Sequence, residues 1–192
     1  MIRTTTTVVL ALAGTALAQY EITIDVENPV LMPGESTVVT LKAGFDPALY
    51  AMAGIGTGLV VSTGTVGLGD AAVVEPMDGP GHSAGSPSST GYDGIIAGQI
   101  HSASAGLYAD PTNPIAFWEV TYTAPLDVAV SFDVDLSTRT RRYDVYVQRT
   151  SSFSESHLIE LVEGSATIHV IPAPASASLL ALGLLAAARR RR

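Results

Sequence analysis

Residues 127–136 read DVAVSFDVDL, and every second side chain in this stretch is large and apolar. The apolar set comprises Val128, Val130, Phe132, Val134 and Leu136. Because side chains along a β-strand point alternately to opposite faces, the pattern predicts a strand with one buried and one solvated face. Such strands are typical of antiparallel sheets. We therefore expect Phe132 and Val134 in a core, and Asp133 and Asp135 in solvent.

The same period recurs along most of the chain. It runs through residues 22–26 and, after a turn at Met32–Glu35, through residues 37–43. Further strands are expected at 55–61, 71–75, 94–102, 115–124, 143–148, 157–162 and 165–171. Nine or ten short strands separated by Gly and Pro predict an all-β fold, an antiparallel β-sandwich of immunoglobulin-like or jelly-roll type. Residues 76–94, rich in Gly, Pro and Ser, are expected to form a long mobile loop.

Two segments carry a family resemblance for this body. Residues 22–43, ITIDVENPVLMPGESTVVTLKA, resemble the first hairpin of cohesin-like and related surface sandwiches. Residues 115–124, IAFWEVTYTA, are similar to a later core strand of the same proteins. The resemblance implies a cohesin-like sandwich as a third form of the predicted fold.

The beginning of the chain has the three parts of a secretory signal peptide. Residues 1–3 supply a positive charge, residues 8–12 an apolar core, and Ala16 and Ala18 a small-x-small cleavage site. Cleavage by signal peptidase after Ala18 would leave Gln19 as the first residue of the exported protein.

The last residues form a second targeting signal. Pro172, Ala173 and Pro174 precede a small-apolar stretch at 175–188, which is followed by four basic residues, Arg189, Arg190, Arg191 and Arg192. This arrangement resembles the PEP-CTERM sorting tail of bacterial surface and matrix proteins, which implies processing by an exosortase-type membrane enzyme. In the usual motif a glutamate stands where this chain has Ala173.

The apolar stretch of the tail is short for a membrane span. As a hydrophobic helix, residues 175–188 would extend about 21 Å, against roughly 30 Å for the hydrocarbon core. We therefore expect a transient anchor. Arginines remain cytoplasmic under the positive-inside rule, which places the upstream chain outside. The predicted organisation is a signal peptide at 1–18, a β-sandwich domain at 19–171 and a sorting tail at 172–192.

Composition restricts what the body could bind. It keeps all eighteen acidic residues of the chain but only five of the ten basic ones, so its formal charge is −13. Such a charge repels nucleic acid and anionic lipid. The chain contains no cysteine, which excludes disulfides, thiolate metal ligands and a cysteine nucleophile. We expect neither a cofactor nor a metal.

One motif in the chain is typical of an enzyme. Residues 81–85, GHSAG, match the G-x-S-x-G nucleophile elbow, in which a strand-to-helix turn exposes the serine. Here Pro80 and Pro87 flank the motif and no helical pattern follows. The sequence therefore favours a protein without catalytic activity, and a secreted hydrolase is the third hypothesis.

Polar clusters along the strands have two interpretations each. Asp127, Asp133 and Asp135 share a strand face, which favours a solvated surface; the alternative is a contribution to a Ca²⁺ site. The four histidines are scattered, and His169 is expected to face solvent. The basic turn at 139–142 favours pairing with nearby carboxylates or solvation, and the alternative is a site for an anionic partner.

The aromatic residues suggest where a ligand would bind. Trp118 shares its face with Val120 and Tyr122, which predicts a core position. Tyr92 and Tyr108 stand in loop-like surroundings and are the candidates for ligand contact. The sequence thus favours a secreted surface or matrix protein with a structural or adhesive role. The alternative is a module of the bacterial envelope that binds polysaccharide or a surface protein.

Overall fold

Strand β3 (Ser36–Gly44) shows how the sequence pattern becomes a sheet. The side chains predicted to share one face are all buried, namely Thr37, Val39, Leu41 and Ala43. In the turn before the strand, Gly34 adopts a φ of +79°, and the Glu35 carboxylate accepts the Met32 N–H at 2.8 Å. The computed structural model describes residues 20–173, and the statements below concern this part of the chain.

Twelve strands of the described chain form two sheets. The first sheet is antiparallel with the order β1-β3-β8-β5, and its other members are β1 (Glu21–Val26), β8 (Ile115–Thr123) and β5 (Leu68–Val73). The second has the order β11-β10-β4-β9-β12-β2, and β7 pairs with β4 and with β6. Its strands are β2 (Val30–Leu31), β4 (Ala51–Val61), β6 (Ser83–Ser88), β7 (Gly91–Gly98), β9 (Phe132–Thr138), β10 (Arg142–Tyr146), β11 (Ser154–Ser156) and β12 (Ser165–Val170).

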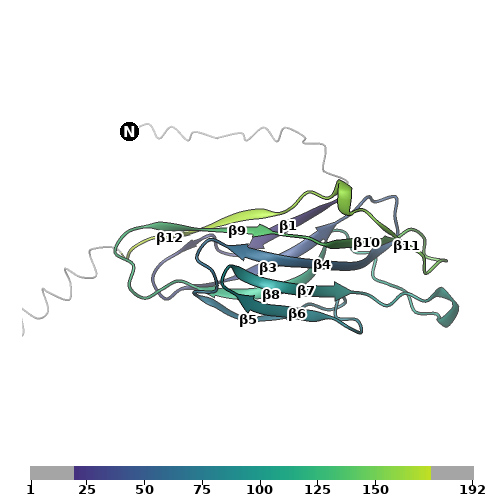
Figure 1. Ribbon diagram of the computed structural model, residues 1–192, viewed down its shortest axis with the longest axis horizontal. Coiled ribbons are helices and arrows are strands. Elements are labelled where there is room, and N and C mark those ends of the chain that lie inside the picture. The colour runs from purple at the N-terminus through teal and green to yellow at the C-terminus, as the bar shows by residue number, and fades with distance from the viewer. Residues whose placement is uncertain (1–19, 174–192) are drawn as a thin grey trace, which may run out of the picture.

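The strands run along the long axis of the molecule, and the chain enters and leaves at opposite ends (Figure 1). Two short 3₁₀ helices, η1 (Ala103–Ala105) and η2 (Leu158–Glu160), lie in the connections. The structure confirms the predicted all-β sandwich. Within residues 20–173 no helix is long and apolar enough to cross a membrane. The predicted signal peptide and the predicted hydrophobic part of the tail lie outside the described residues.

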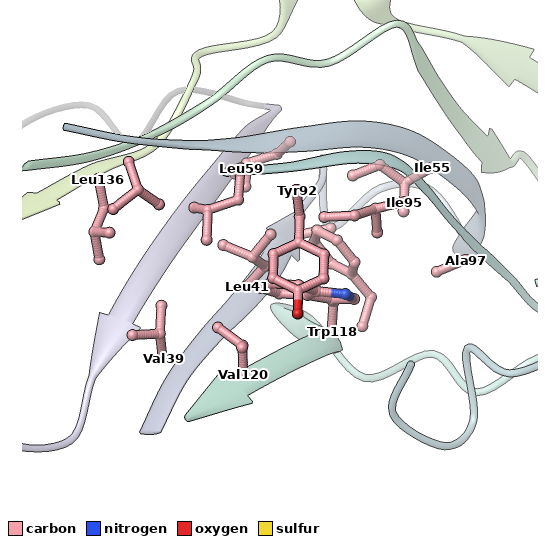
Figure 2. Packing of buried hydrophobic residues seen from close by; sticks show 14 of the residues in the cluster. Val39, Leu41, Ile55, Leu59, Tyr92, Ile95, Ala97, Trp118, Val120 and Leu136 are labelled. Atoms are coloured by element: carbon pink, nitrogen blue, oxygen red, sulfur yellow. The ribbon is translucent and has the colours of Figure 1, made fainter. Parts of the chain in front are cut away.

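The core lies between the two sheets. Leu41 and Trp118 of the first sheet face Ile55 and Tyr92 of the second (Figure 2). The Tyr92 and Trp118 rings meet edge to face, with centroids 5.5 Å apart. The burial of Trp118, Val120 and Tyr122 confirms the prediction for this strand.

The expectation of a long loop at 76–94 is wrong. Residues 83–88 form β6, which is hydrogen-bonded to β7 along five residue pairs. Met77 is fully buried, and its carbonyl accepts the Gly98 N–H at 2.8 Å. Main-chain hydrogen bonds order this segment, although its sequence lacks the alternation of apolar and polar side chains that predicts a strand.

Two other strand predictions need correction. The predicted strand at 128–136 begins only at Phe132, because its partner β12 ends opposite that residue at Val170. Val134 and Leu136 are buried as predicted and Phe132 is half-buried, but Val130 is 76% exposed. Residues 157–162 contain η2 instead of a strand, since the Glu160 N–H turns back to the His157 carbonyl.

Candidate interaction face

The outer face of the second sheet has a floor of glycine. Along β4, Ile55, Thr57 and Leu59 are buried in the core, so the glycines that alternate with them are on the outer side. These glycines are Gly54, Gly56 and Gly58. A Cβ at Gly58 would lie 3.0 Å from the Tyr92 carbonyl oxygen, so β7 approaches closely here. Because β4 has no side chains at these positions, the Arg142 side chain lies against Gly54 and Gly56.

Arginines stand along one side of this floor. The turn between β9 and β10 is hydrogen-bonded to β4 by Arg139, which exchanges two 3.0 Å bonds with Gly58, and by the Arg141 N–H, which donates to Gly56. Arg142 lies opposite Gly56 and forms an ion pair with Asp144. Arg139 and Arg141 are exposed and form no ion pair within residues 20–173.

A single carboxylate holds the arginine turn in place. Glu163, just before β12, accepts three hydrogen bonds of 2.6–2.9 Å from the backbone N–H of Thr140 and the hydroxyls of Thr138 and Thr140. The Thr140 hydroxyl also lies 3.1 Å from that of Thr57 on β4. The three arginines therefore project from a fixed turn.

Two hollows adjoin on this face. The first, which we call the arginine groove, has a volume of about 280 Å³ and lies between the arginine turn, residues 56–58 and residues 93–96. The second, of about 310 Å³, is lined by Gly54, Gly98, Ile100 and Tyr146 among others. Ile96 and Arg142 line both. We call the two hollows together the interaction face.

The two tyrosines expected to contact ligand are placed differently. Tyr92 lies on β7, is only 8% exposed, and donates a 2.7 Å hydrogen bond to the Gly69 carbonyl. Burial, and secondarily the Asp70 carboxylate, raises the pKa of its hydroxyl. Tyr92 is thus a core residue, and its candidacy for ligand contact is corrected. Tyr108 is half-exposed, beneath the guanidinium of Arg149 at 4.5 Å.

The elbow-like motif does not form a nucleophile elbow. Ser83 begins the edge strand β6, and its hydroxyl accepts the Gly85 N–H at 3.1 Å. His82 contacts the Gly79 carbonyl through Nδ1. No helix follows, so the strand-to-helix turn on which that chemistry depends is missing from this segment.

The acidic strand face is exposed, as is His169. Asp133 lies 2.7 Å from His169 across β9 and β12, and Asp135 accepts a hydrogen bond from Thr167. The exposure of His169 confirms its predicted orientation. No three His, Asp or Glu side chains between residues 20 and 173 are grouped as metal ligands. Of the sorting motif, Pro172 and Ala173 fall within this range, whereas Pro174, the cleavage residues Ala16, Ala18 and Gln19, and Arg189–Arg192 lie outside it.

One sequence pattern does indicate the interaction face. Glycine at every second position of 54–58 is a strand pattern in which one face has no side chains. The pairing of Arg142 with Gly56 has no local signal, because it depends on register between strands far apart in sequence.

Comparison with known proteins identifies the fold. No family profile and no curated protein matches the chain. The seventh ScaB type I cohesin of Pseudobacteroides cellulosolvens is 13% identical, with a TM-score of 0.52 over 79% of this chain and 92% of that one. A cohesin module of a Clostridium perfringens family 33 glycoside hydrolase is 9% identical, with a TM-score of 0.49 over 81% and 99%. The sixth cohesin of Acetivibrio cellulolyticus scaffoldin B, solved in complex with a Cel5 dockerin, is 12% identical, with a TM-score of 0.48 over 80% and 99%. The body is a cohesin-like β-sandwich.

Proposed function

We propose that the protein is an exported module that binds a protein partner at the cell surface through the interaction face. The observation that carries this proposal is the pair of adjoining hollows over a glycine floor, flanked by exposed Ile96 and Ile100 and by the arginine turn. Protein interfaces combine apolar contact with arginine, and their strongest contacts fill pockets. Of the structural and adhesive roles expected from the sequence, partner binding through this face favours the adhesive role.

The charge of this face indicates the partner's chemistry. In a body of formal charge −13, the arginine turn gathers three of the five basic residues at one edge of the groove. A partner would place carboxylates against Arg139 and Arg141 and an apolar side chain over Ile96. Polysaccharide is less suited, because Tyr146, the one Tyr, Phe or Trp among the described residues that lines either hollow, is half-buried and donates its hydroxyl to the Gln99 carbonyl at 3.2 Å.

Delivery to the surface is the second part of the proposal. The signal peptide at 1–18 directs export, and the tail at 172–192 holds the protein in the membrane until an exosortase-type enzyme processes it. The mature chain would begin at Gln19 and end near Pro174. Mass spectrometry of protein from the envelope fraction checks both ends. A chain that retains Met1 would refute export, and one that retains Arg189–Arg192 would make the tail a permanent anchor.

Charge reversal tests the interaction face. The double variant Arg139→Glu/Arg141→Glu should lose most retention of the purified body on envelopes of the producing bacterium. Lys42→Glu/Arg149→Glu is the matched control, because it reverses two cations that line neither hollow. Equal losses would indicate general charge attraction, and undiminished retention of the double variant would reject this face as the binding site.

A further inference from the structure

Exposed apolar side chains gather at the end of the sandwich where β12 stops. Each is between 39% and 80% exposed, which for large apolar residues leaves considerable surface in water. We call this set the tail pole, and it consists of Val30, Met32, Val66, Leu126, Val130 and Ile171.

Main-chain contacts join these residues into one surface. The Ile171 N–H donates to the Leu31 carbonyl at 2.9 Å, which places Ile171 beside Val30 and Met32. A Cβ on Gly34 would lie 3.0 Å from Leu126, so the turn after Met32 touches the loop between β8 and β9.

Val66 and Val130, the other two residues of the tail pole, lie beside the ends of neighbouring strands. The Thr123 N–H donates to the Gly67 carbonyl at 2.7 Å, which brings the turn containing Val66 to the end of β8. Val130 precedes Phe132, which pairs with Val170 at the end of β12. These main-chain contacts place all six residues around the end of β12, where the chain leaves the sandwich.

The chain that leaves this pole continues directly into the apolar tail. Only residues 172–174 separate Ile171 from the stretch at 175–188. Three residues span at most about 10 Å, and the headgroup layer on one side of a bilayer takes up about 5–8 Å of that length. A body on so short a tether cannot stand clear of the membrane, and the pole nearest the tether must meet the headgroups.

We propose that the tail pole docks on a zwitterionic lipid surface while the tail is inserted, which orients the sandwich upright on the membrane. The inference rests on the membrane tail of the proposed function. Apolar side chains that enter the boundary between headgroups and acyl chains lose contact with water, as in interfacial anchors. The carboxylates of Glu35, Asp127 and Asp133 surround the same pole, so an anionic lipid surface would repel it.

In this orientation the interaction face extends away from the bilayer along the strands. The end of β12 distant from the tail pole holds η2, whose Ile159 side chain is fully exposed. Ile159 is therefore an apolar control of similar size at the opposite pole. Because the chain has no cysteine, single-cysteine variants can each carry one fluorophore.

The test uses the chain from Gln19 to Arg192, without the proposed signal peptide, reconstituted in phosphatidylcholine vesicles that carry a headgroup nitroxide quencher. Variants Val130→Cys and Ile159→Cys are labelled to report on the two poles, and Leu182→Cys, within the tail, reports on insertion. With the tail inserted, the label at position 130 should be quenched severalfold more than the label at 159. Replacing part of the lipid with phosphatidylserine should weaken quenching at 130.

Three results would overturn the proposal. Equal quenching at 130 and 159 with an inserted tail would refute docking of the pole while retaining the anchor. Stronger quenching at 130 in phosphatidylserine would refute the preference for zwitterionic lipid. A water-exposed label at position 182 would refute the membrane tail, and docking with it.

Discussion

The indole N–H of Trp118 on β8 donates a 2.9 Å hydrogen bond to the backbone carbonyl of Ala84 on β6. Trp118 belongs to the first sheet and β6 to the edge of the second, so this bond crosses the sandwich. It secures a Gly/Ser/Pro-rich strand that has little apolar surface of its own. The edge strand β6 is thus bonded to the core of the sandwich.

Replacing this donor should loosen β6 selectively. Trp118→Phe leaves the Ala84 carbonyl without its partner, which should lower stability by about 1–3 kcal/mol. Hydrogen exchange should show reduced amide protection across residues 83–88. Tyr92→Phe is the control, because it removes a neighbouring donor that bonds to Gly69 instead of β6. Unchanged protection of β6 in Trp118→Phe would contradict the stabilising role.

The corrected start of β9 can be tested by two truncations. Leu136 is buried between the sheets, and Leu136→Ala should reduce the free energy of unfolding by about 2–5 kcal/mol. Val130, which the sequence pattern placed on the same face, is exposed, and Val130→Ala should change it by less than about 0.5 kcal/mol. Urea denaturation of the purified body measures both. Comparable losses of stability in the two variants would indicate that the strand begins before Phe132, as the sequence pattern predicts.

The fold could be predicted where apolar and polar side chains alternate along a strand that pairs with another strand on each side. In β3, every second residue from Thr37 to Ala43 is buried, as the alternation predicts, and strands pair with β3 on both sides. At 128–131 the period continues but the partner strand has ended, and a local pattern contains no information about where a partner ends. Propensity for a strand is therefore not the same as membership of a sheet.

The interaction face was harder to predict because its main features are backbone and register. The arginine turn was visible in the sequence, but its place over Gly56 depends on the pairing of β10 with β4. β6 is built from Ser, Ala, Gly and Pro, so its order comes from main-chain bonds and the Trp118 indole. Tyr92 differs from its sequence expectation for the same reason, since the flanking glycines favour a loop whereas main-chain pairing places it on β7.

The carboxylate of Glu163 should control the geometry of the arginine turn. Glu163→Ala removes three hydrogen bonds to a charged acceptor. One such bond contributes up to about 1.5–3 kcal/mol, and we expect the free energy of unfolding to fall by about that amount for the three together. Retention on envelopes should fall as the arginines lose their fixed positions. Glu119→Ala removes an equal charge from an exposed position on the other sheet and should change neither property. A destabilised variant with full retention would show that the turn need not be fixed.

Buried tyrosines should make the fold sensitive to alkali. Burial is the main cause that raises the pKa above the ordinary 10.0 for five hydroxyls, those of Tyr20, Tyr92, Tyr122, Tyr143 and Tyr146. The folded state therefore keeps these protons at pH values where the unfolded chain releases them. Their contribution to stability is complete below pH 10.0 and is lost as the pH rises toward the folded-state pKa values.

We therefore expect the melting temperature to fall above pH 10.0, and phenolate absorbance to rise together with the loss of the β-sheet circular dichroism signal. Tyr122→Phe keeps the ring but removes one of the buried hydroxyls, so its melting temperature should fall less steeply with pH than that of the wild type. Phenolate absorbance that rises fully while the sheet signal remains intact would mean that these hydroxyls ionise in the folded state, contrary to their burial.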